Sequence, residues 1–336
     1  MVEEYKIDFV VPWVDGSDIN WREEKKKYSP KAENDDAECR YRDIELIKYM
    51  LRSVEKYAPW VNKVHFITWG HLPSWLNTEC PKLNIVKHSD YFPEIYLPTF
   101  CSHPIELNLH RIKGLSEQFV YFNDDMLLNA PLKKEFFFKK GKPRDFACLT
   151  ELYIEDSDDC YGHICLNDTV FTNKEIFYSE SFFKNPFKYI NVKYGIKNNL
   201  KNIFRVFSGR CFTGFKIHHM PAAYLKKTLE RVWEIHKETL ERVSKTKFRS
   251  PYDVSQSLFR NSQLAKGDFV PMKPEEKGRY LKLEKDTGEI IKTIKDERVK
   301  MLCINDIGAE LDFESAKTEI ISALEEKFPE KSSFEK

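Results

Sequence analysis

Short apolar runs, separated by segments with helical spacing, dominate the first 130 residues. Four of these runs are typical of buried strands: Ile7–Trp13, Val64–Trp69, Leu83–Lys87 and Phe119–Phe122. Between the first two runs, apolar residues recur on one helix face, which predicts a helix over Asp43–Tyr57. A second helix is predicted from Pro104 to Gly114. Strands that alternate with helices predict an α/β fold with a mainly parallel, Rossmann-like sheet flanked by helices.

The C-terminal part of the chain predicts a mostly helical architecture. A long amphipathic helix is expected from Pro221 to about Val243, and a break near His236–Lys237 would shorten it. Another helix is expected over Asp253–Leu264. The remaining segments are expected to be a solvated excursion at 22–43, short elements at 133–215, a loop or hairpin at 266–300, and a surface-packed helix at 313–328 with a tail after it.

Composition and charge exclude several classes of protein. Of the 336 residues, 41% are hydrophobic and 14% aromatic, which excludes a disordered chain. The 54 Lys and Arg against 53 Asp and Glu leave a formal charge of +1, so no basic surplus indicates a nucleic-acid partner. No apolar run reaches the roughly 18 residues of a membrane span.

Cysteine usage indicates a reducing compartment. The eight cysteines form no CxxC pair, and their spacings fit no zinc motif. The N-terminal segment lacks the basic start and long apolar core of a signal peptide. We therefore expect reduced core thiols and a cytoplasmic location.

An acidic pair directly follows the fourth predicted strand. Asn123, Asp124 and Asp125 come after four apolar residues, at a strand end where parallel sheets bind ligands. Adjacent carboxylates repel unless a cation or several donors neutralise them. Their hard oxygens suit Mg²⁺ or Mn²⁺, which bridge carboxylates and diphosphate oxygens. The alternative is a polar strand-to-loop transition with exposed acids, and we favour the site.

Two further segments have both a functional and a plain interpretation. Trp13-Val14-Asp15-Gly16 places a carboxylate and a glycine at a strand end, where backbone can approach a phosphate or sugar, although Asp15 could simply cap a turn. Thr99 and Ser102 precede a predicted helix N-terminus, which favours anions, although Ser102 could be its cap. Glu106 and Arg111, within that helix, are individually typical of surface residues.

A fourth segment contains His219, Arg249 and Asp253. His219 immediately precedes the helix expected from Pro221, a suitable place to meet a phosphate. Arg249 and Asp253 lie four residues apart and could be only a surface ion pair worth about 0.3–0.5 kcal/mol. The residues alone favour this plain interpretation. The sequence contains no Walker A, GxGxxG, GxSxG or HExxH pattern to support another enzyme class.

Taken together, these segments resemble the Stealth family of hexose-1-phosphoryltransferases. Its first block is similar to DFVVPWVDGSD at 8–18, and its second to most of Arg40–Leu132. HHMPAAY at 218–224 resembles the third block, and FRSPYDVSQSLF at 248–259 the fourth. CINDIG and KFPEKSSFE also resemble family segments. The chain departs from the family at Cys101, often a small polar residue, and in HMPAAY, where HMPH is frequent.

The resemblance implies transfer of a hexose 1-phosphate from a UDP-sugar to a hydroxyl of an acceptor glycan, with release of UMP, in capsular polysaccharide synthesis. An N-acetylhexosamine 1-phosphate is the expected group. The implied catalytic residues are Asp15, Asp125, His219 and Arg249, with either Asp15 or His219 as the base. Substrate contacts are expected from Trp13, Gly16, Arg42, Thr99, Ser102, Glu106, Arg111, Asn123 and Asp253. The expected metal is Mg²⁺ or Mn²⁺ on Asp124 and Asp125.

We expect one catalytic domain over 1–336, with a nucleotide-sugar-binding half at 1–132. Residues 133–265 would complete the site, and 266–336 would pack on the core. The enzyme would meet its capsular glycan at the inner face of the cell membrane, through peripheral association with the capsule machinery. The alternative is a metal-dependent glycosyltransferase, which would release UDP. A non-catalytic sugar- or nucleotide-binding module would release neither nucleotide.

Overall fold

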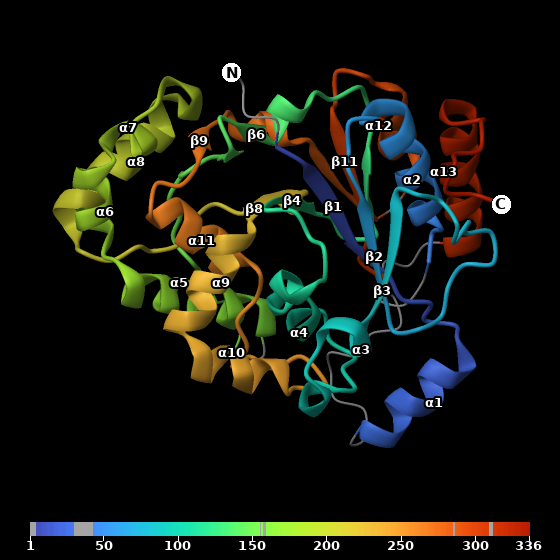
Figure 1. Cartoon of the computed structure of the whole chain (residues 1–336). Coiled ribbons are helices and arrows are strands. Elements are labelled where there is room, and N and C mark those ends of the chain that lie inside the picture. The colour runs from blue at the N-terminus through green and yellow to red at the C-terminus, as the bar shows by residue number, and fades with distance from the viewer. Residues whose placement is uncertain (1–4, 30–42, 155, 157–158, 285, 309–311) are drawn as a thin grey trace.

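A five-stranded sheet lies at the centre of the computed structural model, which describes residues 5–29, 43–154, 156, 159–284, 286–308 and 312–336. Its strand order is β3-β2-β1-β4-β8. The strands are β1 (Ile7–Pro12), β2 (Val64–Thr68), β3 (Leu83–Lys87), β4 (Gln118–Tyr121) and β8 (Ala222–Leu225). The first four run parallel, and β8 runs antiparallel to β4. The predicted α/β fold with a mainly parallel sheet is confirmed (Figure 1).

The apolar strands are explained by burial on both faces of this sheet. In β1, Phe9 and Val11 belong to one core and Val10 belongs to the other. The first core packs α2 (Leu46–Tyr57) and α13 (Phe313–Lys327) against the sheet. The second packs α4 (Ser102–Leu107), α9 (Lys226–Ile235), α10 (Lys237–Ser244) and α11 (Ser257–Ala265), and Figure 1 shows these helices on the opposite side from α2 and α13.

Two smaller sheets extend the central one. The first has the order β10-β11-β5 and consists of β10 (Arg279–Leu283), β11 (Met301–Asp306) and β5 (Met126–Leu128). The second has the order β6-β7-β9 and consists of β6 (Phe138–Lys139), β7 (Lys142–Asp145) and β9 (Val270–Pro271). The loop or hairpin predicted over 266–300 is wrong, because this segment contains β9, β10 and α12 (Gly288–Lys295), and β10 runs parallel to β11. The few apolar residues of this segment, such as Leu283 and Ile294, are buried in the first core, while the charged residues next to them in the sequence are exposed.

Several helix predictions need correction. The helix predicted from Pro221 begins at Lys226, because Ala222–Leu225 pairs with β4 instead, and the break at His236 is confirmed. The predicted excursion at 22–43 contains most of α1 (Ile19–Tyr28), which Asp18 caps and Trp21 anchors by burial. The helix predicted from Pro104 to Gly114 begins at Ser102 and ends at Leu107, and a short 3-10 turn follows it.

The segment predicted to contain only short elements forms a helical layer. It holds α5 (Cys160–Glu175), α6 (Tyr178–Lys184), α7 (Pro186–Tyr189) and α8 (Gly195–Ser208). A separate core of aromatic residues, which includes Tyr178, Tyr189 and Phe212, lies beneath it. The remaining short helix is α3 (His88–Tyr91).

The predicted C-terminal tail is docked on the α/β half. Phe334 is buried in the first core, and Glu335 forms a buried ion pair with Arg52 of α2 at 2.8 Å. The Lys336 backbone N–H donates to Trp75. The seven cysteines in the described part of the chain are all free thiols. Among the described residues, we find no helix with the length and apolar character needed to span a bilayer.

Candidate active site

The direction of β8 brings two distant segments to one edge of the sheet. Because β8 is antiparallel to β4, with Tyr121 opposite Ala222, the start of β8 lies beside the end of β4. His219 Nε2 consequently lies 3.2 Å from Asn123 Nδ2 and 3.5 Å from Asp125 Oδ2. The expectation that His219 stands at a helix N-terminus is wrong, since a strand follows it. Its predicted proximity to the acidic pair rests on strand pairing instead.

Asp125 is held in place by β11. The thiol of Cys303 donates to Asp125 Oδ2 at 3.3 Å, and Asn305 Nδ2 donates to the same oxygen at 3.2 Å. The Ile304 backbone N–H donates to the Asp125 carbonyl at 2.9 Å. In contrast, Oδ1 of Asp125 is buried and has no hydrogen-bond partner among the described residues. One carboxylate oxygen is therefore fixed, and the other has unused lone pairs.

The neighbouring Asp124 is reached by solvent, yet protein encloses it on several sides. This enclosure, followed by the charges of Asp125 and Asp43, raises the pKa of Asp124 to about 7. Burial lowers the pKa of His219, but its interaction with Asp125 outweighs burial, so this pKa lies above its usual value. The site therefore concentrates negative charge beside one imidazole.

This set of atoms fits a divalent cation with oxygen ligands. Asp125 offers a buried oxygen without a partner, and the repulsion between Asp124 and Asp125 would be relieved by a positive ion. Ligating atoms of Asp125, His219 and Cys303 also lie within 4.8 Å of one another. Burial, and then the charge of Asp125, raises the pKa of Cys303 far above the usual range. Its thiol is thus a protonated donor to Asp125, which leaves the carboxylates and His219 as the candidate ligands.

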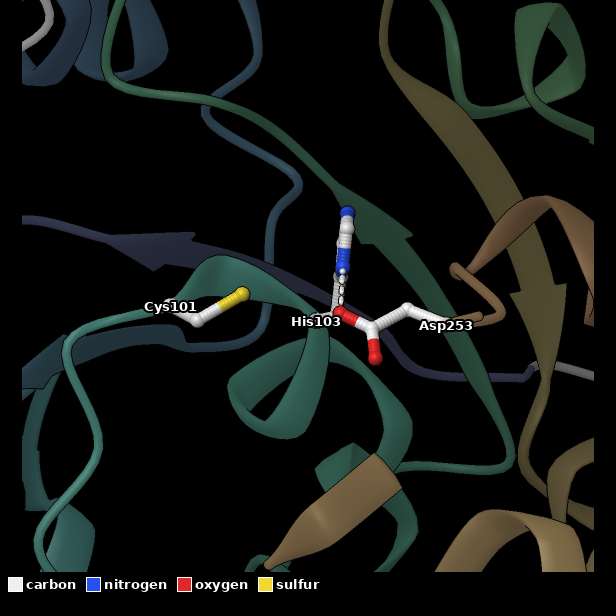
Figure 2. A group of neighbouring side chains, drawn as sticks. All are labelled: Cys101, His103 and Asp253. Atoms are coloured by element: carbon white, nitrogen blue, oxygen red, sulfur yellow. Dashed lines mark hydrogen bonds and ion pairs between the residues drawn. The ribbon is translucent and has the colours of Figure 1, made fainter. Parts of the chain in front are cut away.

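A second buried polar group joins the first turn of α4 to the segment before α11. His103 Nδ1 lies 3.0 Å from Asp253 Oδ2, with Cys101 beside them (Figure 2). Burial opposes a charge on His103, but the neighbouring Cys101 and Asp253 raise its pKa to about 10. Asp253 is completely buried, so its interpretation as a surface residue paired with Arg249 is wrong. Arg249 is half-buried and lies between α10 and α11.

Glu106 links the two groups. Its carboxylate accepts hydrogen bonds from the Tyr121 hydroxyl at 3.2 Å and the Gln256 backbone at 3.3 Å. Its charge acts on both His103 and His219, in each case toward a higher pKa. Glu106 is buried, so the interpretation of this residue as a surface position is wrong. The Glu106 carboxylate therefore lies where the second, third and fourth sequence blocks come together.

The first sequence block, at 8–18, ends in a turn that Asp15 caps, as the simpler of its two interpretations predicted. Asp15 accepts hydrogen bonds from the Ser17 backbone N–H at 2.8 Å and the Ser17 hydroxyl at 2.6 Å. Its own N–H donates to His71 Nε2 at 2.7 Å, and Trp13 packs its buried ring against His71. The Gly16 carbonyl accepts a hydrogen bond from Arg22. No contact among the described residues joins this turn directly to Asp125 or His219.

The other predicted residues have local roles in the structure. The Thr99 hydroxyl donates to the Thr246 carbonyl at 3.1 Å, which ties the segment before α4 to the end of α10. Ser102 is the first residue of α4, and no side-chain cap is formed there. Arg111 lies over the ring of Trp233 at 4.6 Å, and its Nε donates to Asn108. Arg42 lies outside the described residues.

Sequence reasoning missed several residues of this site. Cys303 and Asn305 hold Asp125, and the CINDIG segment that contains them was noticed only as a family resemblance. His71 and Asp43 also influence the site, through Asp15 and Asp124 respectively. His103 directly follows Ser102, but the sequence alone does not indicate its role. None of these residues has a local pattern that indicates its partner, because each partner is distant in sequence.

Fold and site together define an α/β enzyme with a charged centre at the carboxyl ends of its parallel strands. Family models described as Stealth protein conserved region 1 and conserved region 2 match residues 5–33 and 40–145. The chain is 43% identical over 335 residues to a capsular polysaccharide phosphotransferase WcwK of Streptococcus pneumoniae, covering 98% of this chain and 99% of that protein. The chain belongs to the Stealth family and is an enzyme of the phosphotransferase class.

Other similar proteins carry related names. The receptor polysaccharide phosphotransferase WefC of Streptococcus gordonii is 38% identical over 345 residues, with 100% of both chains covered. The exopolysaccharide phosphotransferase cps2G of Lactiplantibacillus plantarum is 36% identical, covering 99% of this chain and 97% of that protein. Among solved structures, the galactosyltransferase LgtC with donor and acceptor sugar analogs has a TM-score of 0.44 and 10% identity, with 95% of each chain covered.

Proposed function

We propose that this enzyme transfers a hexose 1-phosphate, in particular an N-acetylhexosamine 1-phosphate, from a UDP-sugar to a hydroxyl of a capsular glycan. The observation that carries the proposal is the buried Oδ1 of Asp125, which no described residue hydrogen-bonds, beside Asp124 and His219. Phosphoryl transfer places charge on phosphoryl oxygens and needs positioned cations and donors. The full-length relatives named as polysaccharide phosphotransferases support the same reaction class.

In the proposed reaction, the acceptor hydroxyl oxygen attacks the β-phosphorus of the donor. The bond between the β-phosphorus and the oxygen bridging to the α-phosphate breaks, and UMP leaves with that oxygen. The product is a phosphodiester between the sugar and the glycan. The hydroxyl proton passes to a base of the enzyme.

His219 is better placed than Asp15 to accept this proton. Oδ1 of the Asp15 carboxylate accepts two hydrogen bonds from Ser17, which hold Asp15 in the turn. His219 lies beside the acidic pair, and the neighbouring carboxylates make its imidazole more basic. Asn123 Nδ2 lies 3.2 Å from Nε2 of His219, the same ring nitrogen that faces Asp125, and would orient the ring. Arg249 and Arg42 are proposed to neutralise phosphate charge.

Asp124 and Asp125 would hold Mg²⁺ or Mn²⁺, which would supply positive charge to the diphosphate oxygens. Cys303 and Asn305 fix Oδ2 of Asp125, so its Oδ1 is directed away from β11 and stays available. The proposed location is the cytoplasm, at the inner face of the cell membrane.

The released nucleotide tests the proposal against its alternative. The purified chain would be incubated with UDP-sugars, Mg²⁺ and capsule oligosaccharides, and the nucleotide identified by chromatography. UMP supports phosphoryl transfer. UDP would indicate that the acceptor attacks the anomeric carbon, as in a glycosyltransferase, and would overturn it. Binding of UDP-sugars without release of either nucleotide would indicate a non-catalytic binding module.

A further inference from the structure

The helix α8 has its apolar side turned away from the protein. Figure 1 shows α6, α7 and α8 together at one end of the molecule, at the far end from α13. Among the residues of α8, Asn202 is the one that is fully buried. Ordinary surface helices bury an apolar stripe and expose polar residues. The reversed polarity of α8 requires a separate explanation.

Asparagines hold α8 on the protein. The Asn202 side chain accepts a hydrogen bond from the Leu149 backbone and donates to the carbonyls of Ala147 and Tyr189, at 2.7–3.0 Å. Asn199 donates to the Asn191 carbonyl at 2.8 Å. Together with Val206, which packs against the aromatic core beneath, these side chains dock the helix. The exposed apolar residues of α8 are therefore not needed to attach it.

Those apolar residues form a continuous exposed stripe. Ile196, Leu200, Phe204 and Phe207 follow one another at intervals of four, four and three residues, which places them on one helix face. Ile196 is 81% exposed, Phe204 66% and Phe207 83%. α6 and the turn before α8 contact this helix and add the exposed apolar residues Phe183 and Val192, and α7, which contacts α6, adds Phe187. A cluster of this kind is typical of an interaction surface.

The same segment is strongly basic. Residues 181–210 contain seven Lys and Arg and no Asp or Glu, in a chain whose net charge is only +1. In α8, Lys197, Lys201 and Arg205 recur every four residues, on the face between the exposed stripe and the buried asparagines. Two nearby acids, Glu151 and Glu180, pair with Lys201 and Lys184 at its margin.

We propose that α6–α8 form a membrane-docking surface that inserts this apolar stripe into an anionic phospholipid bilayer. An interfacial helix combines large apolar residues on one face with Lys and Arg beside them, which contact acidic headgroups. A second copy of this chain fits less well, because association through this surface would bring two clusters of seven basic residues together. The enzyme would then contact lipid directly, in place of attachment only through partner proteins.

Vesicle binding by the full chain tests this surface independently of catalysis. Cosedimentation would compare phosphatidylcholine vesicles with vesicles containing phosphatidylglycerol. Binding to the anionic vesicles should be at least about tenfold stronger and should weaken in 1 M NaCl. The double variant Phe204→Ser/Phe207→Ser should lower the partition coefficient at least about tenfold, because two buried aromatic rings are lost. Lys197→Gln/Lys201→Gln should reduce only the preference for anionic vesicles.

Ile19→Ser provides a matched control, because Ile19 is an exposed apolar residue of α1 outside this surface. It should bind vesicles like the wild type, and all variants should keep the wild-type thermal transition. No binding to anionic vesicles at low salt would overturn the proposal, and so would equal binding by the Phe variant. Self-association of the wild type that the Phe variant abolishes, without vesicle binding, would assign the surface to a second copy instead.

Discussion

Asn305 on β11 donates a 3.2 Å hydrogen bond to Oδ2 of Asp125, although 180 residues separate the two. The pairing of β11 with β5 fixes this contact, because Cys303 stands opposite Met126, the residue after Asp125. The C-terminal segment thus determines the orientation of a carboxylate that belongs to the second sequence block.

We expect Asn305→Ala to lower turnover about 10-fold to 100-fold, the usual cost of removing a residue that orients a metal ligand. Cys303→Ser should retain most activity, because serine still offers a hydrogen-bond donor to Asp125. Nucleotide release at saturating donor would be measured beside a thermal melt. Wild-type turnover in a folded Asn305→Ala protein would show that this contact does not matter for catalysis.

Activity should depend on a divalent cation, because Asp125 Oδ1 has no hydrogen-bond partner in the described part of the chain and Asp124 lies beside it. EDTA should abolish nucleotide release, and Mg²⁺ or Mn²⁺ should restore it. Asp125→Asn should lower turnover by roughly 100-fold or more, since it weakens the proposed metal contact. Full activity in excess chelator would remove the metal from this mechanism.

His103→Gln should have a pH-dependent effect on stability. The pKa of His103 in the folded protein is raised to about 10, above its usual value. Its ion pair with Asp253 therefore stabilises fully below about pH 6.5, and this contribution disappears as the pH rises through about 10. We expect the variant to lose roughly 3–5 kcal/mol at pH 6 and much less near pH 10, measured by urea unfolding.

His110→Gln provides a control with the opposite trend. Burial lowers the pKa of His110 to about 3, so the folded protein keeps this imidazole neutral. The wild type therefore gains stability as the pH rises from about 3 to about 6.5, the unfolded pKa, and the cost of His110→Gln should grow over that range and stay constant above it. Equal effects of pH on both variants would contradict the assigned charge of His103.

Asp145→Asn should destabilise the protein strongly. Asp145 is buried, accepts two 2.8 Å hydrogen bonds from Arg260, and lies 3.1 Å from Lys277. Burial opposes its charge, but Arg260 and Lys277 hold the pKa of Asp145 well below its usual range. Removal would leave two buried cations, at a cost of roughly 3–5 kcal/mol in the free energy of unfolding.

The exposed pair between Lys142 and Asp268 gives the comparison for this variant. Asp268→Asn should change stability by no more than about 1 kcal/mol, because water already solvates both partners. Urea unfolding would measure both variants. A loss for Asp145→Asn as small as that for Asp268→Asn would show that the buried cluster contributes little.

The strands and the acidic pair could be predicted from the sequence because their signals are local. Each apolar run of the central sheet is a continuous segment, and Asp124 and Asp125 follow one of them directly. The strand β8 was missed because Ala222–Leu225 is equally compatible with the start of a helix. Only its pairing with β4 determines that this segment forms a strand. The same pairing, invisible in the local pattern, determines where His219 lies.

The remaining wrong predictions concern residues whose structure depends on tertiary contacts. Glu106, in a predicted helix, and Asp253, at the start of another, look like surface acids in isolation. The structure buries Glu106 against Tyr121 and Asp253 against His103. The charged segment at 266–300 contains too few apolar residues to predict strands, yet β9 pairs with β7 and β10 pairs with β11. Hydrogen-bond partners far away in the sequence supplied the missing information in each case.

The docked C-terminal segment has a consequence for biosynthesis. Phe334 fills part of the first core and Glu335 neutralises Arg52 of α2, so residues near 335 complete the packing of a helix near residue 50. Until the ribosome has made residues 325–335, Arg52 has neither Glu325 nor Glu335 to pair with. The first core therefore stays incompletely packed while the intervening chain is synthesised. This delays the closure of the α2 side of the sheet until that distant segment has emerged.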